Sequence, residues 1–279
     1  MPEPAGLGNS TDEDKDRRTS QVDMESIATM LRAVPGFAEL DDHSLEHVAA
    51  GGEIADVGAG DVLFREGAAP EALYVLLDGT VSLTGTSTDA SSTVIDILGP
   101  ASSFVLANVL GDEPYLMGAE AVSSAHLVRL PAGQIREVAT AQPAAAMAMM
   151  RAISAELGNI TRQIVDLKVR VAAQRLGAFL LSQVEELTTN RADFRLPVAK
   201  GLLAPWLGCR AENLSRAFMS LRAYGVETHG SRVTLHDIAR LKAYIGLSGT
   251  ARVGGVPTRE PIEKTFGDAF RLRPQPKRR

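Results

Sequence analysis

The feature that most constrains this chain is a regular apolar row between Pro143 and Val171. The apolar residues follow one another at alternating steps of three and four, and they are Met150, Ile153, Leu157, Ile160, Ile164, Leu167 and Val171. This is the a/d pattern of a coiled coil over about three heptads. Such a helix would be roughly 40 Å long, and one chain cannot bury so narrow a seam alone. The spacing therefore predicts a dimerisation helix over 143–171, with a core helix inside one domain as the alternative.

Charge is distributed unevenly along the 279 residues. Residues 1–168 carry 10 Lys and Arg against 25 Asp and Glu, whereas residues 169–246 carry 11 against 6 and residues 247–279 carry 8 against 3. An acidic first part followed by a basic second part suggests that only the second part meets a polyanion. Residues 1–24 and 247–279 are expected to be a disordered tail and a basic flexible tail.

Three classes of protein are disfavoured by what the sequence lacks. The sequence contains no run of 18 apolar residues, so no membrane span is expected. The N-terminus has no signal-peptide pattern, so we expect a cytoplasmic protein. The single cysteine, Cys209, argues against an iron–sulfur cluster or a multi-cysteine metal site within one chain. It lies in a predicted turn, where a structural role and a redox switch are both open.

Short β-rich segments separated by glycines fill the stretch from Ile54 to Leu130. They are Val62–Phe64, Leu73–Leu77, Val81–Leu83, Val94–Leu98 and Ala125–Leu130. Short strands at roughly ten-residue spacing are typical of a jelly roll or barrel. We therefore expect a β-roll domain over residues 25–142.

The basic part of the chain has the pattern of a winged helix-turn-helix over residues 172–246. Helices are predicted at 198–207 and 211–224, followed by a hairpin at 226–235. The second helix of such a motif presents its N-terminal residues to the bases of the major groove. The candidate DNA-contacting residues are Arg210, Glu212, Asn213, Ser215 and Arg216, and the expected buried face is Leu214, Ala217, Phe218 and Leu221. An exposed ion pair between Glu212 and Arg216 is the alternative.

Two stretches resemble the Crp/Fnr transcription regulators. The segment from Gly60 to Leu83 is similar to the first half of a cyclic-nucleotide-binding-type β-roll, and Glu212 to Arg216 resembles the Fnr-type pattern Glu-x-x-Ser-Arg. The resemblance implies an α+β chain with an N-terminal β-roll (jelly roll), a long coiled-coil helix and a C-terminal winged helix-turn-helix. It implies a homodimeric regulator rather than an enzyme. Such a regulator would read a palindromic, TTGAT-like site in double-stranded DNA through Glu212, Ser215 and Arg216, with RNA polymerase as a further partner.

The resemblance also bears on the signal. Family members that bind cyclic nucleotides hold the phosphate with a Gly-Glu pair and a downstream arginine, but residues 104–120 contain no arginine. A buried phosphate would lack a partner, so cAMP and cGMP are not expected. The apolar candidate pocket consists of Phe104, Leu106, Leu110, Tyr115, Leu116 and Met117.

This pocket is either a filled core or a site for a flat apolar cofactor such as haem. The chain is similar in places to the DNR/NNR branch, which implies nitric-oxide sensing through haem, although no histidine matches a family ligand position. Two alternatives stay open. One is a ligand-independent DNA-binding dimer with a scaffold roll. The other is a cupin-type metal enzyme, which needs clustered histidines, whereas only His126 lies on a predicted strand.

Overall fold

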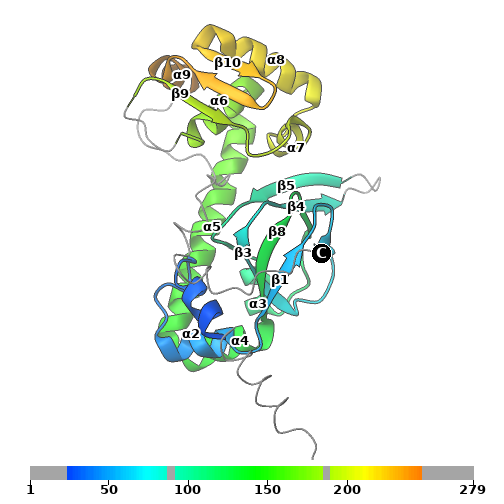
Figure 1. Cartoon of the computed structure of the whole chain (residues 1–279), viewed down its shortest axis with the longest axis vertical. Coiled ribbons are helices and arrows are strands. Elements are labelled where there is room, and N and C mark those ends of the chain that lie inside the picture. The colour runs from blue at the N-terminus through cyan, green and yellow to red at the C-terminus, as the bar shows by residue number, and fades with distance from the viewer. Residues whose placement is uncertain (1–23, 87–91, 185–188, 247–279) are drawn as a thin grey trace, which may run out of the picture.

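The computed structural model describes residues 24–86, 92–184 and 189–246. A long helix, α5 (Pro143–Val169), connects two parts of different architecture. Figure 1 shows α5 as a rod with the β-roll alongside it and a smaller domain at its C-terminal end. Apart from Met24, the two expected tails lie outside the described residues.

The β-roll consists of two antiparallel sheets, each of four strands in the described part of the chain. The strand order is β1-β8-β3-β6 in one sheet and β2-β7-β4-β5 in the other. The strands are β1 (Glu53–Val57), β2 (Val62–Phe64), β3 (Ala72–Asp78), β4 (Val81–Thr86), β5 (Ser92–Leu98), β6 (Ser102–Phe104), β7 (Gly118–Ala121) and β8 (Ala125–Pro131). The predicted fold class is confirmed, and β1, β6 and β7 add to the five strands expected.

Strand β3 is buried on both faces because it separates two hydrophobic cores. The side chains on one face pack against helices, and they are Leu73, Val75 and Leu77. The side chains on the other face lie inside the roll, and they are Ala72, Tyr74 and Leu76. This explains why the strand is a continuous apolar run instead of an alternating one. The chain leaves β3 through Gly79, whose φ is +90° and where a Cβ would collide with the backbone of Ser124.

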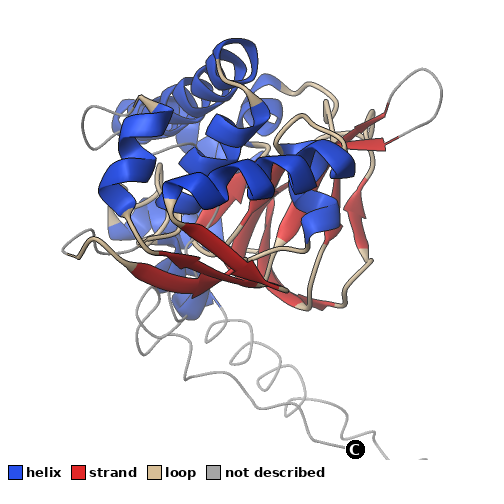
Figure 2. Cartoon of the chain, turned by 90° about the horizontal axis from the view of Figure 1, so that it is seen from above, coloured by secondary structure: helices blue, strands red, loops and turns tan. Residues whose placement is uncertain are grey.

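The helices near the start of α5 close the outer of these two cores. They are residues 24–31, α2 (Asp42–Ala49), α3 (Leu106–Gly111) and α4 (Ala132–Ala141). The first three turns of α5 join this core, where Ala145, Ala148 and Met149 are buried and Ile153 is half-buried. In the view of Figure 2, helices gather on one side of the molecule and strands on the other.

Helix α5 begins at Pro143, as predicted, and ends at Val169, two residues earlier than predicted. Arg170 leaves the helix with extended angles, φ −100° and ψ 141°. None of the helices in the described residues, α5 included, is long and apolar enough to cross a membrane.

The C-terminal domain contains the predicted helix-turn-helix and wing. Its helices are α6 (Ala172–Ser182), α7 (Lys200–Trp206), α8 (Ala211–Leu221), the short η1 (Arg222–Tyr224) and α9 (Ile238–Ile245). Its strands are β9 (Ala192–Arg195), β10 (Val226–His229) and β11 (Arg232–Leu235), in the sheet order β10-β11-β9. Strand β9 was not predicted, because four residues with only Ala192 and Phe194 facing inward are too short for a pattern.

Candidate nucleic-acid interface and sensor interior

Helix α8 separates its apolar and polar residues onto opposite faces. As predicted, its buried face consists of Leu214, Ala217, Phe218 and Leu221. The Nζ atom of Lys200, at the start of α7, lies 4.7 Å from the centroid of the Phe218 ring, which is a cation–π contact. The shared core and this contact fix α7 and α8 relative to each other.

The five predicted DNA-contacting residues lie together on the exposed side of α8 or at its N-cap. They are Arg210, Glu212, Asn213, Ser215 and Arg216, all exposed. Among the contacts of the described residues, no hydrogen bond or ion pair joins Glu212 to Arg216. The first turns of α8 therefore present a guanidinium, a carboxylate and an amide to solvent, which are groups suited to reading base edges.

An arginine that sequence reasoning missed holds the turn before α8. Arg175, on α6, donates from Nε to the carbonyl of Leu207 at 2.8 Å and from Nη2 to that of Gly208 at 3.4 Å. Its Nη1 donates to the carbonyl of Arg170 at 2.5 Å. One side chain thus ties the helix-turn-helix to the end of α5. The signal in the sequence was a single arginine between apolar residues of α6.

Cys209 occupies the same turn and is half-buried. Its backbone N–H donates to the carbonyl of Ala204 at 2.9 Å. Burial raises the pKa of the Cys209 thiol, so the reactive thiolate is disfavoured. These observations favour a structural role for Cys209 over a redox switch.

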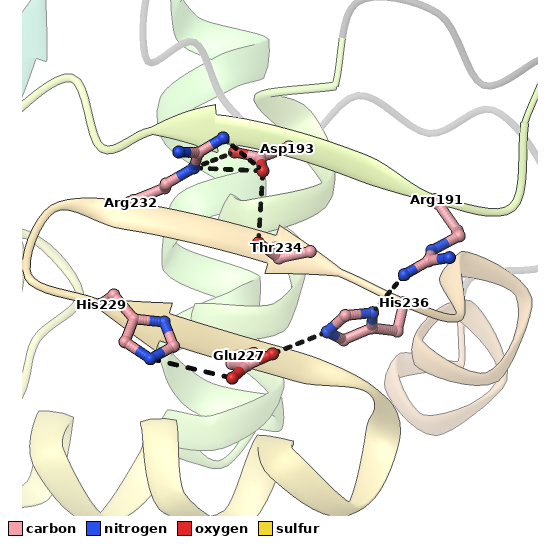
Figure 3. A network of polar contacts seen from close by, with 7 residues as sticks. All are labelled: Arg191, Asp193, Glu227, His229, Arg232, Thr234 and His236. Atoms are coloured by element: carbon pink, nitrogen blue, oxygen red, sulfur yellow. Dashed lines mark hydrogen bonds and ion pairs between the residues drawn. The ribbon is translucent and has the colours of Figure 1, made fainter.

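A network of polar side chains ties the three strands of the wing together (Figure 3). Arg191 Nη2 donates to Nδ1 of His236 at 2.9 Å, and Nε2 of His236 lies 2.9 Å from Oε2 of Glu227. Because an arginine only donates, this geometry fits a neutral histidine with its proton on Nε2. Arg232 binds both carboxylate oxygens of Asp193 at 2.9–3.1 Å. The bond from His236 lowers the pKa of Glu227, and the bonds from Arg232 lower that of Asp193.

The predicted dimerisation row lies mostly on the surface of the single chain. Six of its seven members have exposed fractions of 42–62%, and they are Met150, Leu157, Ile160, Ile164, Leu167 and Val171. The seventh, Ile153, is half-buried where it packs against the core beside the roll. The described part of the chain therefore leaves most of this row uncovered.

Aromatic rings fill the space between the two sheets of the roll. The ring centroid of Phe64 lies 4.2 Å from that of Tyr115 and 5.2 Å from that of Tyr74, and Tyr74 stacks on Phe104 at 5.5 Å. The hydroxyl of Tyr115 donates to the carbonyl of Ala72 at 2.7 Å and accepts from its N–H at 3.2 Å. Tyr115 thus meets its hydrogen-bonding needs with the roll's own backbone.

The six residues of the predicted pocket do not line one cavity. Phe104 and Tyr115 belong to the aromatic core, with Met117 packed against it. Leu106 and Leu110 belong to the other core, beside α4 and α5. Leu116 is 75% exposed. The reason is the turn between β6 and α3, where Val105 has a φ of +66° and successive residues are sent to different cores.

Comparison with known families agrees with this two-part architecture. The model of the cyclic nucleotide-binding domain matches residues 55–142, and that of the Crp-like helix-turn-helix domain matches residues 174–244. Both domains occur in one chain, joined by a long helix, and the two matches together cover more than half of it. The chain is a transcription regulator of the Crp/Fnr family.

Relatives of this Crp/Fnr regulator are distant but match along most of their length. The transcriptional activator protein FnrA of Stutzerimonas stutzeri is 24% identical over 191 residues, which are 67% of this chain and 78% of that protein. The nitrogen fixation regulation protein FixK of Azorhizobium caulinodans is 27% identical over 201 residues, or 70% and 80%. The structure of FixK2 from Bradyrhizobium japonicum has the same fold, with a TM-score of 0.61, 20% identity and coverage of 72% and 98%. These relatives are Fnr- and FixK-type regulators and do not single out the DNR/NNR branch.

The residues of this Crp/Fnr regulator do not fit a cyclic nucleotide. The stretch 104–120 has no arginine to pair with a phosphate, and the ring and hydroxyl of Tyr115 are engaged inside the roll. A phosphate bound there would lose its hydration, and the stretch itself supplies no cation in return.

The described residues also offer no ready ligand set for haem or a metal. No group of three His, Cys, Asp or Glu side chains among them could hold a metal ion. His126 pairs with Asp56 of the neighbouring strand, and His47 lies 3.0 Å from Glu137 on α4. No histidine belongs to the aromatic core of the roll.

Proposed function

We propose that this regulator acts as a homodimer on a palindromic site in double-stranded DNA. The exposed apolar row of α5 carries the proposal. A second copy of the same helix would cover both rows at once, since the 3-4 spacing is that of a coiled-coil seam. A dimer also presents two α8 helices, which would bind two half-sites whose centres are about 34 Å apart. We infer that it works in the cytoplasm, where it meets the DNA and RNA polymerase.

We propose that the half-sites are TTGAT-like and are read by Glu212, Ser215 and Arg216. Support comes from the exposure of all three side chains in the first turns of α8. Arginine can bind guanine O6 and N7 with two parallel bonds, and glutamate can accept from cytosine N4. The spacing Glu-x-x-Ser-Arg places these groups on one face of the helix.

We infer that the roll responds to a signal other than a cyclic nucleotide. Nitric oxide or another gas bound through haem is one candidate, carried only by the resemblance of short stretches to the DNR/NNR branch. The aromatic core favours the second candidate, in which the roll binds no ligand and serves as a scaffold. An absorbance scan of the purified chain with added haem decides between them, because a stable Soret band that shifts with nitric oxide supports the first and its absence supports the second.

A gel-shift assay tests the proposed function. The probes are a TTGAT-type palindrome, the same palindrome with scrambled half-sites, and a duplex with a single half-site. We expect tight binding to the palindrome alone, because a dimer gains from two contacts made at once. Equal binding to all three duplexes would contradict sequence-specific reading by a dimer.

A further inference from the structure

One carboxylate joins three elements at the boundary between the roll and the DNA-binding domain. Oδ1 of Asp96, on β5, accepts from Nε1 of Trp206 at 3.0 Å and from Nε2 of Gln163 at 3.4 Å. Trp206 belongs to α7 and Gln163 to α5. Figure 1 shows α7 lying against β5 at this point. The bond to Trp206 links residues that are 110 positions apart in the sequence.

Apolar contacts surround this carboxylate. The next residue, Ile97, is fully buried and packs in the core of the DNA-binding domain instead of in the roll, with Val94 beside it. Burial raises the pKa of Asp96, and burial together with the charge of Asp96 raises the pKa of Glu156 on α5. No salt bridge to Asp96 occurs within the described part of the chain. Burial therefore disfavours the charged form of the Asp96 carboxylate, whereas its hydrogen bonds stabilise that form.

The path of the backbone makes this contact important. The only covalent route from the roll to the DNA-binding domain is α5, and the chain is extended at Arg170 and Val171 before α6 begins. The two extended residues interrupt the helix, and the bonds of Arg175 are one attachment between the domain and the end of α5. The contact of β5 with α7 is a second attachment, and it opposes rotation of the domain about the end of α5.

We propose that Asp96 is a positioning residue for DNA binding. Its bond to Trp206 holds α7 against strand β5, and the position of α7 in turn sets the orientation of α8. A displacement of β5 would then move the base-reading residues of α8. The inference rests on the proposed dimeric DNA binding, because the direction of α8 matters most when two such helices must reach two half-sites together.

The test uses the full chain, whose single tryptophan is Trp206. Tryptophan fluorescence and its quenching by acrylamide therefore report on the surroundings of Trp206 alone, which include Asp96 and the ring of Phe179. The variants are Asp96→Ala, which removes the acceptor, and Asp96→Asn, which keeps an acceptor oxygen without the charge. Glu120→Gln, an exposed carboxylate on the same sheet, is the matched control for the change in charge.

We expect Asp96→Ala to shift the balance toward the undocked domain by about fivefold, seen as a red-shifted emission and stronger quenching. The same variant should lose its preference among palindromes whose half-site spacing is changed by one or two base pairs. Asp96→Asn and Glu120→Gln should keep both the quenching and the spacing preference of the wild type, since Trp206 retains its acceptor.

Two outcomes separate failure of this inference from failure of the proposed function. If the wild type binds the palindrome with a spacing preference and Asp96→Ala keeps that preference and the same quenching, Asp96 positions nothing. If the wild type binds no palindrome at all, the proposed function fails, while the fluorescence comparison still decides whether Asp96 holds Trp206.

Discussion

Helices α5 and α8 each carry a row of apolar side chains, but the chain covers only one of the two rows. Phe218 and Leu221 of α8 are 7% and 0% exposed, because α6 and α7 pack against this face of the helix. Leu157 and Ile164 of α5 are 62% and 48% exposed, because they lie beyond the core at the start of the helix. The comparison teaches that one kind of row stabilises its own domain, whereas the other is available to a second chain.

The largest effect is expected from a charge placed in the exposed row of α5, because it tests whether this row forms the dimer interface. Leu157→Asp would bring two carboxylates together in an apolar seam, and an unpaired buried charge costs about 3–5 kcal/mol. We therefore expect the dissociation constant of the dimer to rise at least about 100-fold. The folded single chain should be unaffected, because Leu157 is exposed in it. Sedimentation equilibrium measures the dissociation constant.

Ala155→Asp is the matched control, since Ala155 is also exposed on α5 but lies outside the 3-4 row. It should leave the dissociation constant unchanged. Equal weakening by both substitutions would argue against the row as the seam.

The covered row should respond in the opposite way. Phe218→Ala removes a buried ring, and we expect the free energy of unfolding of the DNA-binding domain to fall by about 3–5 kcal/mol. Leu157→Ala should change the unfolding of the single chain by no more than about 0.5 kcal/mol, because its side chain is exposed there. Urea denaturation of both variants in the background of a dimer-disrupting substitution gives the two numbers. A large loss for Leu157→Ala would mean that the α5 row is part of a core.

The exposed face of α8 should affect specificity and leave stability alone. Arg216→Ala is expected to reduce discrimination by about 1–3 kcal/mol at one base pair of each half-site. Arg216→Lys keeps the charge but loses the paired donors, so it should lose discrimination while keeping most non-specific binding. Competition gel shifts with single-base variants of the half-site measure both effects. Full discrimination by Arg216→Ala would show that residue 216 reads no base.

The smallest expected effect concerns the wing. Because hydrogen bonds lower the pKa values of Asp193 and Glu227 in the folded chain, their contribution to stability is present at neutral pH. It is lost as the pH falls through those lowered values. The protection factor of the Thr234 amide, which is the exchange rate corrected for its intrinsic pH dependence, should fall only in that acid range, and Asp193→Asn should remove part of the change. A fall of the protection factor already near neutral pH would contradict this order of protonation.

Local patterns predicted most of the fold, whereas long-range contacts could not be predicted. The heptad row, the glycine-bounded strands and the apolar face of α8 are periodicities within one segment, and the structure contains each of them. Asp96 and Arg175 were missed because their bonds join residues 110 and 32 positions apart. The predicted pocket was divided between two cores because a single turn at Val105 redirects the chain. The composition of the segment does not predict the turn at Val105.

The mass of the full chain in solution, measured by sedimentation equilibrium with and without a palindromic duplex, tests the central claim most directly. We predict the mass of two chains in the absence of DNA and of two chains per duplex in its presence. A mass of one chain in both conditions, at concentrations where the duplex is saturated, would contradict the account.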